Sequence, residues 1–216
     1  MSAPKTPPPQ HLFTPRLSLE LFSRDKPEHF EIMLACINNP IAYETMGDYG
    51  IKTKEQFMAL NEHTLLTYPI AFDGMLVYII HLKDKEDEAI GAVTLAQRNR
   101  KIPPDIGWAM LPAYMGKGYA TEAAKEFLRW LTEDWELPVC TWPEETNRRS
   151  VRVAEKLGFV DGGVVRSVDG HGHGDTKEGE GEGELVKTWV LPGMKKLDEA
   201  GIVDISFWGE KNDDKK

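Results

Sequence analysis

The chain has 216 residues, of which 41% are hydrophobic, so it can bury the core of one ordinary domain. Its 26 lysine and arginine residues against 35 aspartate and glutamate residues give a net charge of −9, which argues against nucleic acid or an anionic membrane as a partner, because both require a dense basic patch. The longest apolar run, 75–80, is too short to cross a bilayer, and two cysteines cannot form a disulfide framework, so we expect a single-domain cytoplasmic protein.

The first elements are predicted from local signals. Residues 1–11 are rich in proline and lack the apolar segment of a secretion signal, so we expect a disordered leader there. The alternation over 16–21 places three leucines on one face and predicts a strand. Pro27 opens a predicted helix. The sequence Thr-Lys-Glu-Gln at 53–56 has the form of a capping box, which predicts the start of another helix.

Strands dominate the rest of the chain. They are predicted at 75–82, 89–95, 106–110, 139–142, 159–168 and 185–191, with an exposed hairpin connection at 83–88. A regular amphipathic helix follows residue 118, and another covers 148–157 and ends at Gly158. The glycine and glutamate repeat at 169–183 predicts a mobile loop, and the tail, 193–216, has no clear pattern. This order favours an α+β layered fold with a mixed sheet, in one domain over 12–192.

A glycine pair opens the amphipathic helix and is the first feature with chemical content. Gly116 and Gly118 let the backbone approach an anion closely, the helix amides bind phosphate oxygens, and Lys117 adds a cation. The pair also suits a simple helix start without a ligand. The segment lacks the pattern of a Walker loop, and Thr121 replaces the third glycine of a dinucleotide fingerprint.

A second segment, 145–159, contains Asn147-x-x-Ser150 and then Glu-Lys-Leu-Gly-Phe. Together with 115–123, it resembles the GNAT family of acetyl-CoA-dependent N-acetyltransferases. Within that family the chain is most similar to the branch that includes the ribosomal-protein alanine and serine N-acetyltransferases. Residues 14–19 also resemble the first strand of that branch. The resemblance covers about 12–192.

The resemblance implies a mixed, mostly antiparallel sheet that is splayed at its centre, flanked by helices, with acetyl-CoA in the opening and no metal. The pyrophosphate would be held by the backbone amides of Met115, Gly116, Lys117, Gly118, Tyr119 and Ala120. The pantetheine arm would pair with the backbone of Trp108, Ala109, Met110 and Leu111, as an added strand does. Asn147 is predicted both to cap its helix and to contact the CoA arm. Ala113 departs from the family pattern, which often has Gln or Arg there.

Acetyl transfer to an amine requires a base for the amine proton and a group that stabilises the leaving thiolate. The resemblance makes Asp105 the candidate base, since the branch commonly carries Glu there; the alternative is an Asp that only solvates a turn. Many GNAT enzymes use a Tyr at the place of Ala154, whereas the resembled branch uses a Ser at the place of Ser150. Ser150 is therefore the candidate acid; the alternative is a Ser that bonds only to the backbone.

The acceptor stays open between a protein N-terminus, a polyamine and a small amine, and a homodimer also stays open. Two rival functions are a non-catalytic CoA-binding protein on the same fold, favoured by Ala154, and a nucleotide-binding protein. His171 and His173, in the predicted mobile loop at 169–183, are a poor metal site, and Cys140 lacks a nearby His for covalent catalysis.

Overall fold

The computed structural model describes residues 6–59, 76–168 and 183–206, and within these residues nine strands form one sheet in the order β1-β2-β3-β4-β5-β6-β8-β7-β9. The strands are β1 (His11–Phe13), β2 (Leu17–Leu21), β3 (Val77–Leu82), β4 (Lys85–Ala96), β5 (Asp105–Met110), β6 (Cys140–Thr141), β7 (Val160–Ser167), β8 (Glu184–Val190) and β9 (Asp204–Ile205). The helices are α1 (Pro27–Ile37), α2 (Pro40–Met46), α4 (Tyr119–Arg129) and α5 (Arg148–Lys156), with a 3-10 turn, η1 (Pro112–Tyr114), before α4 and a π-helical turn, η2 (Trp130–Asp134), after it. None of the helices in the described part of the chain has the length and apolar character that a membrane crossing requires.

The sheet is mixed and mostly antiparallel, as predicted, and it divides between β5 and β6. Strands β1 to β5 pair antiparallel in succession, and β6, β8 and β7 form a second antiparallel group. The two groups are joined in parallel at one register position, Asp105 opposite Cys140. The side chain of Thr141 also donates a hydrogen bond to the carbonyl of Ile106 at 2.9 Å. After that point the strands separate, so the edge of β5 from Trp108 to Met110 carries no ladder partner on the β6 side within the described residues.

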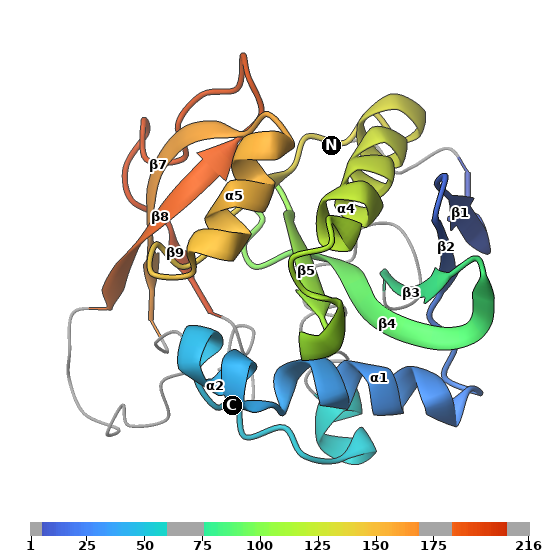
Figure 1. Cartoon of the computed structure of the whole chain (residues 1–216). Helices are drawn as coiled ribbons and strands as arrows, with labels where there is room; N and C mark the ends of the chain where they lie inside the picture. Colours follow the sequence, from blue (N-terminus) through green and yellow to red (C-terminus); the bar gives the residue numbers. More distant parts are fainter. Residues whose placement is uncertain (1–5, 60–75, 169–182, 207–216) are drawn as a thin grey trace, which may run out of the picture.

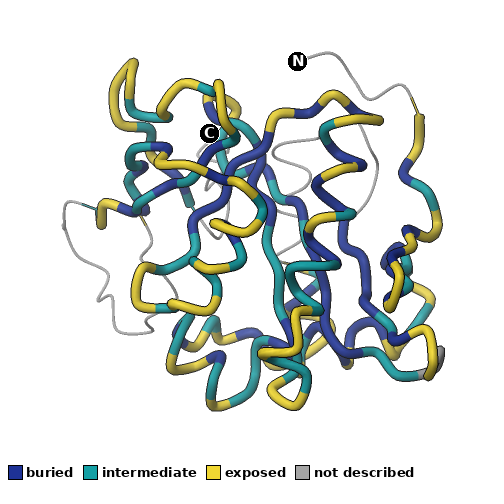
Figure 2. The backbone as a smooth tube through the Cα atoms, turned by 45° about the horizontal axis from the view of Figure 1, so that its top comes forward, coloured by how far each residue is buried: buried dark blue, intermediate teal, exposed yellow. Residues whose placement is uncertain are grey.

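The helices cover both faces of the sheet (Figure 1). The alternation along β3 explains the two layers, because Tyr78 and Ile80 pack with α4, whereas Val77 and Ile79 pack with α1. Figure 2 shows the buried strands at the centre and the exposed helical turns outside them. The core on the α4 side contains more buried residues than the core on the α1 side, and Phe127 of α4 is fully buried in it.

Several local predictions are confirmed atom by atom. Thr53 Oγ1 accepts a hydrogen bond from the backbone N–H of Gln56 at 3.2 Å, and Gln56 Oε1 accepts one from the N–H of Thr53 at 3.0 Å, which is the reciprocal capping box. Gly158 has a φ of 86°, the left-handed conformation expected after α5. Pro27 is the first residue of α1.

Other boundaries differ from the predictions. Strand β4 begins at Lys85, so the expected hairpin connection shrinks to a short turn at 83–84. His11, the last residue of the predicted leader, pairs with Glu20 in the sheet, and the carbonyl of Pro9 accepts a hydrogen bond from the Tyr78 hydroxyl at 2.7 Å. Part of the predicted tail also joins the sheet, as β9 beside β7. Residues 169–182 of the predicted loop, with His171 and His173, lie outside the described residues, as do 1–5, 60–75 and 207–216.

Candidate active site

The segment 115–120, called here the glycine loop, follows η1 and includes the first two residues of α4, and it has an unusual backbone. Gly116 and Gly118 have φ values of 78° and 84°, a region that residues with a Cβ rarely adopt. Gly118 is the N-cap of α4 and has no side chain to accept from the first helical amides. Those amides, which a helix leaves without intrahelical partners, therefore open toward the space in front of α4. The sequence prediction of an anion-binding backbone fits this geometry.

The glycine loop is fixed by a cluster that sequence reasoning did not find. Glu122, in the first turn of α4, accepts hydrogen bonds from the Thr14 hydroxyl at 2.6 Å, the Arg16 backbone N–H at 2.9 Å and Arg16 Nε at 2.6 Å. Arg16 also donates to the carbonyl of Lys117 at 3.2 Å and covers the Tyr119 ring. The turn between β1 and β2 thus holds both the loop and the start of α4.

A cavity of about 630 Å³ lies in the opening of the sheet. It is bounded by β5, the glycine loop, α5 and α2, and in Figure 1 α2 lies below α5 across this opening. The predicted site residues that line it are Trp108, Ala109, Met110, Met115, Gly116, Gly118, Tyr119, Ala120, Asn147 and Ser150. Leu111 and Lys117 do not line it; the Lys117 ammonium lies 5.2 Å from the centroid of the Tyr114 ring.

Ser150 and Trp108 meet inside the cavity. Trp108 Nε1 donates a hydrogen bond to Ser150 Oγ at 2.9 Å, across 42 residues of sequence. An indole N–H can only donate, so the Ser150 hydroxyl acts as the acceptor in this pair and keeps its own proton for a third group. Asn147 Oδ1 accepts from the Ser150 backbone N–H at 3.1 Å, which is the helix cap that the sequence predicts.

Ala154, one turn after Ser150 on α5, is part of the core. Ala154 is fully buried in the core against α4 and does not line the cavity, so a larger side chain there would meet packed atoms. Ser150, one turn earlier, lines the cavity instead. The hydroxyl therefore occupies the place on α5 that faces the opening.

Asp105 lies at the other end of β5 and does not line the cavity. Its carboxylate is buried and pairs with Arg98 Nε at 3.1 Å. Burial raises the pKa of this carboxyl group, and the Arg98 guanidinium opposes the rise. Asp105 shares a strand face with Ala109, about 14 Å along the strand. Asp105 thus lies outside the cavity that Ser150 lines.

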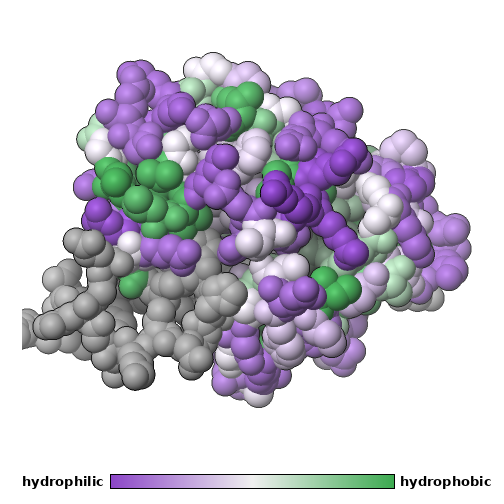
Figure 3. All heavy atoms as spheres, turned by 60° about the vertical axis from the view of Figure 1, so that its left-hand side comes forward, coloured by the Kyte–Doolittle hydropathy of each residue, from purple (hydrophilic) through white to green (hydrophobic). Residues whose placement is uncertain are grey.

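The charges of the cavity are unevenly distributed. The basic residues that line it all belong to α5: Arg148, Arg149, Arg152 and Lys156. Figure 3 brings the side of the molecule that carries α5 forward and shows strongly hydrophilic side chains gathered at the middle of that face. Glu44 of α2 is the acidic residue among the described lining residues.

One cluster outside the cavity has the composition of a metal site. The ligand atoms of Glu20, His29 and His81 lie within 4.8 Å of one another. However, His29 Nδ1 accepts a hydrogen bond from the Ser23 backbone N–H at 2.9 Å, so the proton of the neutral ring is on Nε2, which faces Glu20 Oε2 at 3.5 Å. Lys26 Nζ also donates a hydrogen bond to the other carboxylate oxygen, Glu20 Oε1, at 2.6 Å. This arrangement suits a buried hydrogen-bonded network better than a metal ion.

Comparisons with known proteins agree with this geometry. A family model described as acetyltransferase (GNAT) domain matches residues 16–160. A GNAT-family acetyltransferase from Bacillus anthracis is 19% identical, with a TM-score of 0.60 over 84% of this chain and 97% of that chain. A putative ribosomal-protein-serine acetyltransferase from Vibrio cholerae is 16% identical, with a TM-score of 0.60 over 88% and 99%. Spermidine N-acetyltransferase from Vibrio cholerae, in complex with CoA and spermine, is 17% identical, with a TM-score of 0.57 over 81% and 94%.

The three solved structures establish the shared fold. The family match covers more than half of the 216 residues and includes the glycine loop, α4 and α5, which together bound the cavity. The family prediction is therefore confirmed, and the chain belongs to the GNAT family of acetyltransferases.

Proposed function

We propose that this protein is an N-acetyltransferase that moves the acetyl group of acetyl-CoA to a primary amine by direct attack in a ternary complex. The observation that carries the proposal is that the glycine loop, the open edge of β5 and the Ser150 hydroxyl all line one cavity. A bound thioester is thereby surrounded by anion-binding amides, strand-pairing groups and a hydroxyl donor.

The donor fits the residues that are present. The glycine loop offers backbone amides to the pyrophosphate, and the cations of α5 lie beside it, since Arg149 Nη1 is 3.6 Å from Met115 Sδ. The open edge from Trp108 to Met110 offers the N–H and C=O groups that amides of the pantetheine arm can satisfy. The side-chain amide of Asn147 lies at the start of the same cavity wall and is available to the arm.

The reaction forms a bond between the amine nitrogen and the acetyl carbon while the bond from that carbon to sulfur breaks. The electron pair of the broken bond leaves on sulfur, and the amine loses a proton. We assign Ser150 as the hydrogen-bond donor to the developing thiolate, because the bond from Trp108 fixes the oxygen and leaves the hydroxyl proton for the sulfur.

Asp105 stays the proposed base, acting through water. A carboxylate whose pKa is raised by burial accepts a proton more readily near neutral pH than an exposed one does. Its distance from the cavity means that a direct contact with the amine is not part of the proposal.

The test is release of CoA thiol from acetyl-CoA across a panel of amines. Ser150→Ala is expected to lower kcat about 100-fold with the Kd for acetyl-CoA unchanged, because the lost donor acts on the leaving sulfur. Ser18→Ala removes a hydroxyl from β2, far from the cavity, and is the matched control. If the wild-type protein binds CoA but none of the amines in the panel leads to thiol release, the non-catalytic alternative replaces this proposal. Thermal stabilisation by ATP or NAD in place of CoA would instead indicate a nucleotide-binding protein.

A further inference from the structure

The cavity has two ends of different chemistry. Its donor end carries the glycine loop and the cations of α5, which match the phosphates of CoA. Its other end is the wall formed by α2 and the end of α1, called here the α2 wall. Because the donor occupies the cationic end, an acceptor that approaches the thioester from the opposite side passes over the α2 wall.

The α2 wall is mostly apolar and carries one charge. Cys36, Ile41, Ala42 and Met46 line it, together with Glu44 and with Thr45, whose hydroxyl donates a hydrogen bond to the carbonyl of Ile41 at 2.8 Å. Burial raises the pKa of the Cys36 thiol to about 12, so this side chain is uncharged at neutral pH. Glu44 makes no ion pair with another described residue, and its carboxylate is exposed. The wall therefore presents one uncompensated negative charge beside apolar side chains.

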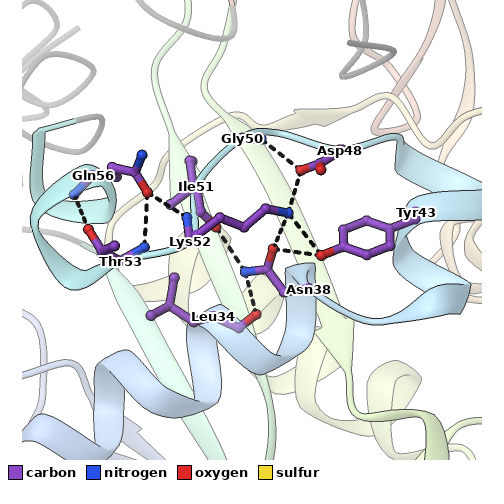
Figure 4. A network of polar contacts seen from close by, with 9 residues as sticks. All are labelled: Leu34, Asn38, Tyr43, Asp48, Gly50, Ile51, Lys52, Thr53 and Gln56. Carbon is purple, nitrogen blue, oxygen red and sulfur yellow. Dashed lines mark hydrogen bonds and ion pairs between the residues drawn. The ribbon is translucent and has the colours of Figure 1, made fainter.

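The position of α2 is fixed by polar contacts on its outer side (Figure 4). Lys52 Nζ lies 2.8 Å from Asn38 Oδ1, 2.9 Å from the Tyr43 hydroxyl and 2.7 Å from Asp48 Oδ1. Asn39 caps α2 by accepting from the Ala42 backbone N–H at 3.0 Å. Lys52 thus pairs with the nearby Asp48, and the charge of Glu44 is left for a ligand.

We infer that the acceptor is a primary amine with a single positive charge next to an apolar substituent, and that Glu44 binds its ammonium group. This inference rests on the proposed function. One carboxylate pairs with one ammonium, and the apolar side chains of the α2 wall cover the substituent. A second ammonium on the same molecule would find no further carboxylate among the described lining residues and would meet the cations of α5. Before attack, the bound ammonium loses its proton to the base, and the neutral nitrogen then reaches the thioester.

The experiment compares two acceptors of equal length, hexylamine and 1,6-diaminohexane, in the thiol-release assay. The wild-type kcat/KM is expected to be about tenfold higher for hexylamine. Glu44→Gln is expected to raise the KM for hexylamine about fivefold and to leave the KM for acetyl-CoA unchanged, because an exposed ion pair is lost and the donor end is intact. Glu31→Gln removes an equal charge from an exposed position of α1 outside the cavity and is the matched control.

A gain of specificity completes the test. Ile41 lies one turn before Glu44, so Ile41→Glu places a second carboxylate on the same face of α2 and is expected to raise kcat/KM for the diamine relative to hexylamine. Equal use of both amines by the wild type, or an unchanged KM in Glu44→Gln, would overturn the inference and leave acetyl transfer intact. If no amine releases thiol, it is the proposed function that fails.

Discussion

Substitution of Gly116 by alanine separates the backbone requirement of the glycine loop from its role in binding. Gly116 has a φ of 78°, and a Cβ at this position would meet no atom within 4 Å, so the cost is conformational and not steric. A left-handed conformation costs a residue with a Cβ about 1 kcal/mol, which corresponds to a fall in Tm of about 2–4 °C for a domain of this size.

Gly193 provides a matched control for that substitution. Its φ is 88°, a Cβ there also meets nothing within 4 Å, and it lies outside the cavity. Both variants are expected to lose similar stability in thermal unfolding. Gly116→Ala alone is expected to weaken CoA binding, by about tenfold in titration calorimetry, because relaxation of the loop turns an amide away from a phosphate oxygen and loses one charge-assisted hydrogen bond. Equal Kd values in the two variants would refute the assignment of the loop as the pyrophosphate site.

Two further predictions concern buried charges. Asp105→Asn removes the carboxylate that pairs with the Arg98 guanidinium, so the free energy of unfolding is expected to fall by about 3 kcal/mol in urea titration. If Asp105 is also the base, kcat should fall at neutral pH and partly recover in alkaline buffer. An unchanged kcat would exclude the role of Asp105 as the base. Burial lowers the pKa of His29 below its usual 6.5, so the unfolded chain takes up this proton first and stability should decrease as the pH falls below about 6.5. His29→Asn should reduce that slope.

Acidification should have a second phase, from Glu20. Burial alone would raise the pKa of this carboxyl group, but the Lys26 ammonium together with His29 and His81 outweighs burial and holds the pKa below the usual 4.5. The folded state thus keeps the carboxylate charged, and the stability that this contributes is present above about pH 4.5 and is lost below it. The loss of stability from His29 thus begins near pH 6.5, and the loss from Glu20 begins near pH 4.5.

Elements marked by local chemistry could be predicted from the sequence. The capping box at Thr53 and the glycine after α5 involve contacts between residues a few positions apart, so their signals are contained in the sequence window. Helix α2 was missed, although Asn39-Pro40 combines a preferred cap with a proline at the first helical position. At seven residues it is too short for the apolar periodicity by which the other helices were found.

The composition of the cavity could not be predicted in the same way. The contacts of Arg16 with Glu122 join residues 106 positions apart, and Glu44 lines the same cavity as residues of α5 that follow it by about a hundred positions. Such neighbours depend on how the layers pack, which a single sequence does not encode in any local pattern. Asp105, just before the predicted strand at 106–110, was expected at the cleft from the family resemblance, whereas the structure places it outside the lining of the cavity.

The separation of β5 from β6 accounts for the site as a whole. Strand β5 pairs with β4 along one edge, and one register position joins its other edge to β6. Among the residues that the structure describes, that second edge has no ladder partner from Trp108 onward. The same strand then leads through η1 into the glycine loop, so the open edge and the open helix amides follow each other directly along the chain. A ladder that continued past Cys140 would close both the strand edge and the cavity together. The shortness of β6, two residues, therefore leaves β5 free for the pairing that we propose with the amides of the pantetheine arm.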